Sequence, residues 1–225
     1  MFELQGVTFS YPKSSEVFSD VSFSIKPGGF FIFKGEECSG KTTLLYILCG
    51  LLLPTKGKLL KSFSASKKKR YLLGASNQIL KEVAFISSLD SLVPHLTVQE
   101  NILFPYVLQK SDKESHIRHA DEALQWLGIK RLTNKYPERL SKADKILVLL
   151  ARAILCKPKC IMIDEPMRDL SVEKQQYILS FLSTLNKNGI TIVVTDNSRF
   201  KFTEGKGEVF SLRSQKIISG DICAT

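Results

Sequence analysis

The sequence lacks any hydrophobic run long enough to cross a bilayer. Although 44% of its 225 residues are hydrophobic, no stretch approaches the roughly 20 consecutive apolar residues that a membrane-spanning helix needs. The first residues, MFELQGVTFSY, also lack the basic segment followed by an apolar one that marks a secretory signal. We therefore expect no transmembrane segment and no export signal.

Cysteine is scarce as well. The five cysteines are an odd number without the spacing of a disulfide framework, which favours a reducing compartment. Cys156 and Cys160 have no second cysteine pair and no histidine nearby, so we expect small buried residues rather than metal ligands. These features predict a cytoplasmic protein. Its length allows one sizeable α/β domain or two small ones.

Acidic residues are fewer than basic ones, 22 against 32, which gives a net charge of +10. Part of the excess is local, since Lys56, Lys58, Lys61 and the run Lys67-Lys68-Lys69-Arg70 lie close together in the sequence. Three interpretations of this cluster stay open. It forms a solvated loop, it lies near anionic lipid headgroups, or it contacts nucleic acid.

The stretch from Phe30 to Leu48, FFIFKGEECSGKTTLLYIL, carries the clearest chemistry. Its apolar start predicts a buried strand, and a helix is expected from about Lys41. Between them, Gly35, four further residues and then Gly40-Lys41-Thr42 match the phosphate loop. Such a loop holds phosphates with backbone N–H groups and the helix N-terminus, while the lysine reaches the β- and γ-phosphates and the hydroxyl ligates Mg²⁺. This pattern predicts nucleoside triphosphate binding.

A second chemical element is the segment Ile161-Met-Ile-Asp164-Glu165-Pro166. Two adjacent carboxylates end an apolar strand, at the sheet edge where ligands of α/β proteins gather. Asp164 is placed to hold Mg²⁺, and Glu165 to orient or polarise the attacking water. The alternative is a strand that merely ends in a polar turn.

Periodicity predicts the other elements. Strands are expected at Phe2–Phe9, Val21–Ile25, Lys58–Phe63, Val83–Ile86, Cys160–Ile163 and Ile190–Thr195, with a terminal hairpin at Glu208–Leu212 and Lys216–Ser219. Helices are expected from Thr97 to Pro105, from Ile117 to Leu127 with Gly128 as C-cap, at Ile146–Leu155 and at Glu173–Leu185, and residues 64–76 are expected to form a basic loop. No internal repeat or domain linker is visible.

With these elements in order, the chain resembles the ATP-binding subunits of ABC transporters over nearly its whole length. Segments SYP, DVSFSIKPGG, GEECSGKTT, HLTVQENI, LSKADKILVLLARAI and IMIDEP are similar to family motifs in order and spacing. The proline in ENILFPYVL and the short chain look most like the branch that serves lipoprotein release, macrolide efflux and cell division. In that branch the membrane partners transmit force.

The resemblance implies an α/β fold of the P-loop NTPase type. It would have a RecA-like core with a mixed sheet and an antiparallel β edge, at about residues 1–86 and 160–225 of a single ABC domain, and an inserted helical subdomain at about 91–157. Two such domains, as a homodimer or heterodimer, would sandwich ATP and Mg²⁺ on the cytoplasmic face of a membrane and act on an integral membrane transporter subunit. The implied nucleotide contacts are Tyr11, Gly35, Cys38, Ser39, Gly40, Lys41, Thr42, Thr43 and, from the signature segment, Ser141.

The sequence departs from this family at several contacts. Where the signature template reads LSGGQ, this chain has Leu140-Ser141-Lys142-Ala143-Asp144, so two glycines that admit phosphate are replaced. Ser88, a candidate Mg²⁺ ligand, stands where a Mg²⁺-sensing glutamine is expected. Asp196 replaces the switch histidine, and like charges repel at a γ-phosphate. Ser171 falls on the aspartate that closes the dimer.

Cys38 replaces a glycine of the family's phosphate loop, beside Glu36 and Glu37. The general template tolerates any residue there, so binding should survive. A thiol near a helix N-terminus tends to react, whereas a buried thiol is inert, and both possibilities stay open for Cys38.

Two hypotheses follow for the activity. The chain is either a working transport ATPase with slow hydrolysis, in which Glu165 and Lys41 are catalytic, or an ATP-binding subunit without turnover that serves regulation or structure. Retention of Lys41 and Glu165 favours the first, and the altered switch residues favour the second. A nucleic-acid-directed ABC protein is a third class that only the basic cluster supports, so no nucleic acid partner is expected.

Overall fold

The computed structural model describes residues 2–61, 70–71, 82–87, 91–106, 113–197, 207–213 and 215–219. The chain divides into two compact units. The first comprises Met1–Phe85, Lys159–Arg168 and Leu182–Thr225, and the second comprises Ile86–Pro158 and Asp169–Phe181. The segment Asp169–Phe181, expected within the RecA-like core, thus groups with the second unit. Assignment of the two units to the family's subdomains stays a prediction.

The first unit contains a six-stranded mixed sheet in the order β10-β9-β3-β8-β7-β6. Its strands are β3 (Phe30–Lys34), β6 (Val83–Ile86), β7 (Cys160–Ile163), β8 (Thr191–Asp196), β9 (Glu208–Arg213) and β10 (Lys216–Ser219). Strand β3 pairs in parallel with β8 and β9, while β9 and β10 form the expected antiparallel hairpin. Strands β3, β7 and β8 are almost wholly buried, which matches the apolar runs Phe30–Phe33, Cys160–Ile163 and Ile192–Val194 within them.

A second, antiparallel sheet of the same unit has the order β2-β1-β4-β5. Its strands are β1 (Phe2–Ser10), β2 (Glu16–Ile25), β4 (Lys56–Lys61) and β5 (Arg70–Tyr71). Strand β2 begins five residues before the predicted Val21, because its pairing with β1 continues through register shifts that break the alternating pattern. The short strand β5 lies inside the stretch predicted to be a loop.

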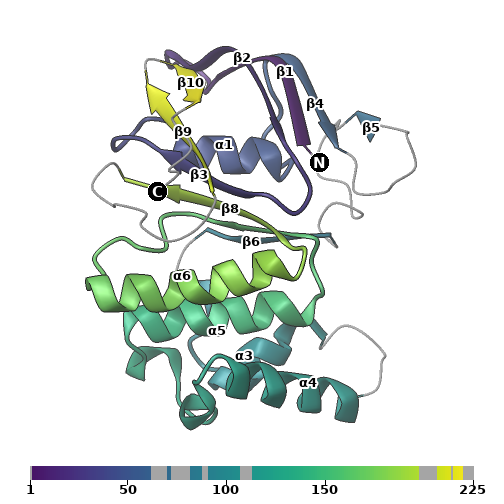
Figure 1. Cartoon of the computed structure of the whole chain (residues 1–225), viewed down its shortest axis with the longest axis vertical. Coiled ribbons are helices and arrows are strands. Elements are labelled where there is room, and N and C mark those ends of the chain that lie inside the picture. The colour runs from purple at the N-terminus through teal and green to yellow at the C-terminus, as the bar shows by residue number, and fades with distance from the viewer. Residues whose placement is uncertain are drawn as a thin grey trace. The chain divides into compact units, whose positions relative to one another are not determined.

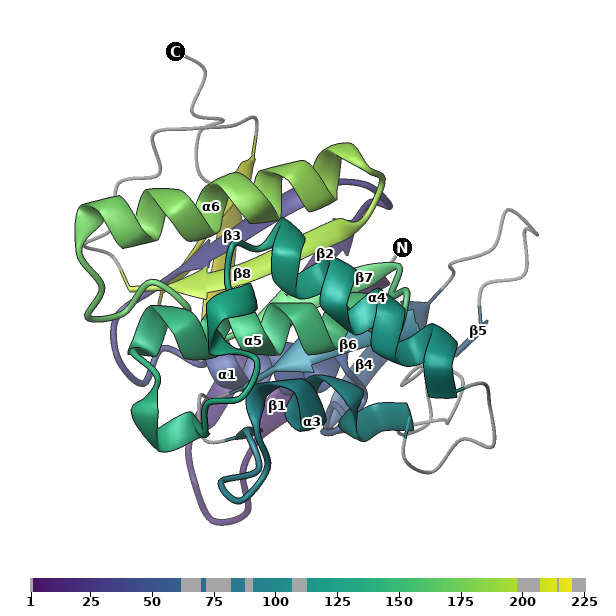
Figure 2. The same cartoon turned by 90° about the horizontal axis from the view of Figure 1, so that it is seen from below.

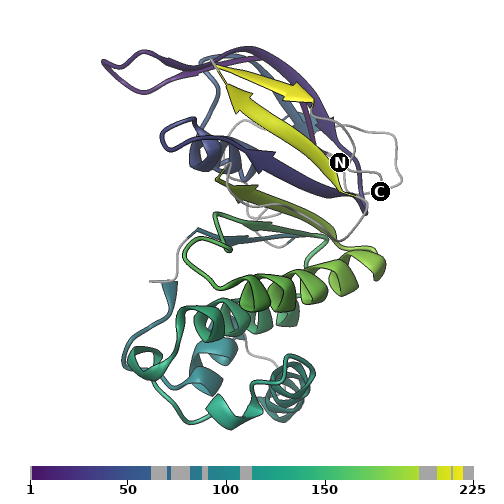
Figure 3. The ribbon, with the colours of Figure 1, turned by 60° about the vertical axis from the view of Figure 1, so that its left-hand side comes forward.

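Helix α1 (Lys41–Leu48) lies between the two sheets, as Figures 1 and 3 show. Leu44, Leu45 and Leu48, the residues that predicted this helix, are wholly buried in one core with residues of both sheets. Packing on both sides therefore fixes the helix whose first turn belongs to the phosphate loop.

The helices α3, α4 and α5 of the second unit pack against one another (Figure 2). They span Val98–Leu103, Lys113–Trp126 and Lys142–Leu155, with short 3₁₀ turns at Phe104–Tyr106, Lys130–Leu132 and Pro137–Arg139. As predicted, α3 ends just before Pro105, and Gly128, with φ of 67°, follows the end of α4. Helix α6 (Val172–Lys187) crosses from the second unit into the first.

Some local predictions were wrong. Helix α5 starts four residues before Ile146, because Ser141 caps it and the polar first turn follows. Cys156, expected to be buried, is exposed.

Lys61, part of the basic cluster, is buried instead of solvated, with its Nζ 3.9 Å from Glu82 and above the ring of Phe2. Burial lowers the pKa of Lys61 to about 8, an effect partly offset by Glu82. Lys67, Lys68 and Lys69 lie outside the described residues. Over the part of the chain that the structure describes, no helix is both long and apolar enough to span a membrane.

Candidate functional site

The phosphate-loop sequence forms the turn between β3 and α1. Gly40 caps α1 with φ of 93°, and Cys38 also has a positive φ of 61°. A Cβ on Gly35 would lie 2.3 Å from Ser39 Oγ, so a side chain here would displace Ser39 where the loop folds back on itself. The backbone N–H of Gly35 donates to the carbonyl of Asp196, which fixes the start of the loop to the end of β8.

Lys41 points back into this loop. Its Nζ donates to the carbonyl oxygens of Gly35 at 2.8 Å and Glu36 at 2.6 Å. The same Nζ lies 3.2 Å from Glu165 Oε1, and only 4% of the lysine side chain is exposed. A buried ammonium in a ring of oxygens can exchange these partners for phosphate oxygens.

Asp164 faces Thr42 across the end of the sheet. The Thr42 hydroxyl donates to Asp164 Oδ2 at 2.6 Å, and the Thr195 hydroxyl donates to Asp164 Oδ1. Thr195 also accepts the N–H of Glu165 at 2.9 Å. The structure thus brings together Lys41, Thr42 and the two carboxylates of the strand end.

The donors suit Mg²⁺, because a threonine hydroxyl and a carboxylate are oxygen ligands of the kind that Mg²⁺ shares with phosphates and water. Ser39 Oγ fits a phosphate, since this buried atom has no hydrogen-bond partner among the described residues. Thr42 and Asp164 could therefore hold the ion and the loop could hold the phosphates. No cluster of three or more His, Cys, Asp or Glu side chains suited to a metal occurs in the described ranges.

Glu165 has a φ of 44°, an uncommon backbone conformation for a residue with a side chain. Arg168 donates from Nη1 to Glu165 Oε2 at 3.2 Å and from Nη2 to Glu37 Oε1 at 2.9 Å. The sequence interpretation missed Arg168. The available signal was a basic residue three positions after Glu165, together with an acidic residue in the phosphate loop.

Tyr11 lies beside Thr43 in the first turn of α1. Its hydroxyl is 3.0 Å from the Thr43 hydroxyl, its ring meets Phe9 edge-on, and 39% of the residue is exposed. A partly exposed ring held beside the loop could stack on a base.

Asp196 is only 2% exposed, and its Oδ2 has no hydrogen-bond partner in the described part of the chain. Burial raises the pKa of Asp196 to about 6, an effect that Lys34 and the N–H of Asn197 partly offset. A carboxylate therefore stands at the phosphate loop, at the end of the strand that pairs with β3.

The predicted signature residues belong to the second unit, where they stabilise a helix start. Ser141 Oγ accepts from the N–H of Asp144 and donates to its Oδ2 at 2.6 Å, which caps α5. Lys142 Nζ lies 3.2 Å from Asp169 Oδ2. The Ser171 carbonyl accepts the N–H of Gln175 at the start of α6. Ser88 lies outside the described residues.

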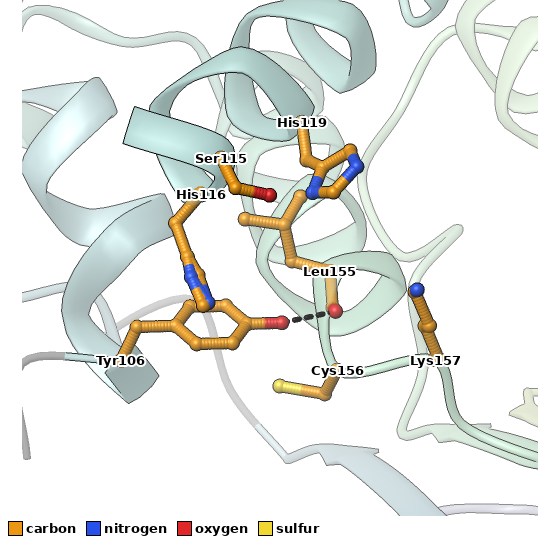
Figure 4. A pocket seen from close by; sticks show the side chains of 7 residues that line it. All are labelled: Tyr106, Ser115, His116, His119, Leu155, Cys156 and Lys157. Atoms are coloured by element: carbon orange, nitrogen blue, oxygen red, sulfur yellow. Dashed lines mark hydrogen bonds between the residues drawn. The ribbon is translucent and has the colours of Figure 1, made fainter. Parts of the chain in front are cut away.

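An open pocket of about 320 Å³ occurs elsewhere in the second unit (Figure 4). The His116 ring stacks on Tyr106 at a centroid distance of 3.9 Å, and the Tyr106 hydroxyl donates to the Leu155 carbonyl. His119, Cys156 and Lys157 also line this pocket, which the sequence interpretation did not single out.

Comparison with known proteins agrees with this geometry. The model of the family described as ABC transporter matches residues 18–168. An uncharacterised ABC transporter ATP-binding protein of Methanocaldococcus jannaschii is 30% identical over 97% of this chain and 98% of its own. A putative hemin import ATP-binding protein of Staphylococcus epidermidis is 34% identical over 84% of this chain and 86% of its own.

Solved structures agree as well. A dimeric ABC transporter cassette superposes with a TM-score of 0.80 at 26% identity, covering 96% of both chains. A dimeric post-hydrolysis cassette bound to ADP and Pi gives 0.78 at 25% identity, also over 96% of both. These matches confirm the mixed α/β fold of the P-loop type that the sequence predicted. The chain therefore belongs to the ABC transporter family, as an ATP-binding domain.

Proposed function

We propose that this protein is the ATP-binding subunit of a membrane transport or force-transmitting complex and that it hydrolyses ATP slowly. One observation carries the proposal: Lys41 and Thr42 of the phosphate loop lie in direct contact with Glu165 and Asp164. A packed core alone does not require a buried lysine paired with a carboxylate at a sheet edge, next to a threonine that is hydrogen-bonded to a second carboxylate.

Each side chain has a role in this proposal. Lys41 exchanges the carbonyls of Gly35 and Glu36 for the β- and γ-phosphates, and Thr42 and Asp164 hold Mg²⁺, whose charge helps to neutralise those phosphates. Glu165 orients the attacking water and accepts its proton. Tyr11 stacks on the adenine, while Ser39, Gly40, Thr43 and the backbone of Cys38 bind phosphate.

We expect slow turnover because several residues of the proposed site differ from those of the family template. Asp196 offers a buried carboxyl where a cation would help a γ-phosphate. Lys142 and Ala143 fill space that the family keeps open with glycines. One missing electrostatic contact costs about 10²- to 10³-fold in other enzymes, although such losses need not add.

The second candidate is an ATP-binding subunit that holds a complex together without turnover. The buried carboxyl of Asp196, whose Oδ2 has no hydrogen-bond partner among the described residues, favours it, because the ionised form would oppose the transition state. The unusual backbone of Glu165 and its contact with Lys41 favour hydrolysis instead.

A steady-state phosphate-release assay separates the two candidates. We expect slow release by the unchanged chain, and release at background level after Glu165→Gln. Lys41→Ala serves as the binding control, because it should abolish both nucleotide binding and release. Equal rates of phosphate release by the unchanged chain and Glu165→Gln would reject the hypothesis of slow hydrolysis. The hypothesis of an ATP-binding subunit without turnover would then remain.

The complex around the chain is also proposed. Its partners would be an integral membrane transporter subunit and a second ATP-binding chain, identical or related, on the cytoplasmic face of the membrane. The dimeric cassettes of similar structure and the import proteins of similar sequence support this assembly. Identifying the membrane subunit that co-purifies with the chain tests it and would also test the predicted lipoprotein-release branch.

A further inference from the structure

Among the residues that the structure describes, acidic side chains outnumber basic ones around the phosphate loop. The acidic groups are Glu36, Glu37, Asp164, Glu165 and Asp196, and the basic ones are Lys34, Lys41 and Arg168. A triphosphate carries about four negative charges at neutral pH, so each acidic group opposes its binding and each cation matters. Lys34 belongs to strand β3 and Lys41 to helix α1, which flank the loop. Arg168 is far from the loop in sequence but contacts Glu37 of the loop.

Arg168 joins two parts of the site. The ion pairs run from Glu37 to Arg168 at 2.9 Å, from Arg168 to Glu165 at 3.2 Å, and from Glu165 to Lys41 at 3.2 Å. The guanidinium is therefore separated from the phosphate-binding ammonium by a single carboxylate. In the proposed function Glu165 orients the attacking water, and this role would place Arg168 on the side of the terminal phosphate.

We infer that Arg168 contacts the terminal phosphate of bound ATP within its own chain and supplies positive charge that the altered switch and signature positions do not. This inference rests on the proposed function, since it assigns a residue to the same site. Such a contact is what an arginine supplied in cis provides in other phosphoryl-transfer enzymes.

The present partners of Arg168 can be exchanged. Glu37 is 73% exposed in its side chain and Arg168 48%, so their pair is solvated and weak. A guanidinium binds a phosphate with two parallel hydrogen bonds, and the terminal phosphate carries more charge than one carboxylate. When Arg168 turns to phosphate, Glu165 Oε2 becomes available to accept a proton from water. ATP, but not ADP, would make this change.

The test compares the affinities of the whole chain for ATP and ADP, each with Mg²⁺, by calorimetry. For Arg168→Ala we expect ATP affinity to fall by about 10- to 100-fold, the size of one lost charge-assisted contact, and ADP affinity to change less than about twofold. Arg168→Lys should retain part of the preference for ATP over ADP, because a lysine keeps the positive charge but cannot form the two parallel hydrogen bonds of a guanidinium.

Lys159→Ala is the matched control. Lys159 also forms an exposed ion pair, with Glu82 at 2.8 Å, and precedes the opposite end of the same strand β7. Its loss removes one positive charge from the first unit without touching the phosphate loop, so neither affinity should change. Equal losses in Arg168→Ala and Lys159→Ala would overturn the inference, because they would show a general charge effect.

The double variant Glu37→Ala with Arg168→Ala distinguishes a direct contact of Arg168 with phosphate from mere neutralisation of the Glu37 charge. If Arg168 only offsets Glu37, the double variant regains the affinity for ATP, which would overturn the inference. If Arg168 contacts phosphate, the weak ATP binding persists. Equal losses for ATP and ADP in Arg168→Ala would also overturn it, and an unchanged chain that binds neither nucleotide would reject the proposed function itself.

Discussion

Asp196 shows how one buried carboxyl ties stability to pH. The folded chain keeps the proton of Asp196 up to a pKa of about 6, whereas an unfolded chain loses it near 4. Between these values the folded state binds more protons, so this group lowers the free energy of unfolding as pH rises through the window. Above pH 6 the full cost of the buried charge is present.

Asp196→Asn should therefore raise the free energy of unfolding at pH 7, by about 1 to 3 kcal/mol, since one pKa unit corresponds to about 1.4 kcal/mol. The gain should shrink toward zero well below pH 4, where the carboxyl is protonated in both the folded and the unfolded state. Urea unfolding at several pH values measures it. Asp121→Asn, at an exposed ion pair with Lys130, is the control. A gain that does not depend on pH would contradict the explanation.

Cys38 provides a second prediction for a single residue. It is exposed, and it lies in the turn between Gly35 and Gly40. Bound MgATP should cover the thiol, so saturating nucleotide should slow its alkylation by about tenfold or more, as protection follows the bound fraction. Mass spectrometry of labelled peptides measures this, with the exposed Cys156 as internal control. Unchanged labelling of Cys38 would show that its thiol does not lie beside the bound nucleotide.

Single residues also mark the limit of what the sequence could predict. Lys41, Thr42, Asp164 and Glu165 were identified because each follows a strand or opens a helix in a known spacing. The contact of Arg168 with Glu37 joins positions 131 residues apart, and no local pattern encodes it. It depends on the strand order, which places β7 next to β8 and β8 next to β3.

At the scale of elements, the start of α5 combines two roles. Ser141 Oγ accepts the N–H of Asp144 in the first turn, and it also occupies the predicted signature position. The sequence placed the helix start at Ile146, because periodicity reports the buried face and ignores a polar first turn. The cap residue itself was visible in the sequence, and a capping argument would have found the boundary.

Ser141→Ala should lower the free energy of unfolding by about 1 kcal/mol, the usual cost of losing an N-cap. Chemical denaturation without nucleotide measures this, since no phosphate contact contributes there. Ser180→Ala, inside α6, is the matched control and should be close to neutral because alanine favours a helix interior. Equal stability of Ser141→Ala and the unchanged chain would show that the cap contributes nothing.

At the scale of the whole molecule, the question is how two chains associate. Lys142 stands where the family template has glycine, and its ammonium pairs with Asp169 in the second unit. If a partner's ATP approaches the signature segment, the Lys142 side chain occupies space that the phosphates need, whereas Ala143 is buried in its own chain. We therefore expect weak association of identical chains.

Replacement of Lys142 and Ala143 by glycine should strengthen ATP-dependent association by about tenfold or more in a Glu165→Gln background, the size expected for one added backbone contact. Light scattering with and without MgATP measures the dimer. Lys145→Gly, in the first turn of α5, controls for weakening of the helix by glycine. Association that is already strong in Glu165→Gln alone, and unchanged by the glycines, would contradict the steric argument.

The positions of the cysteines allow the distance between the two units to be measured with labels on natural residues. Burial raises the pKa of Cys49 to about 12 and that of Cys160 further, so both thiols stay unreactive. The exposed Cys38 lies in the first unit and the exposed Cys156 in the second. Once Cys223 is replaced by serine, paramagnetic labels on these two natural positions would report the distance distribution between the units, with and without ATP, in an otherwise native sequence.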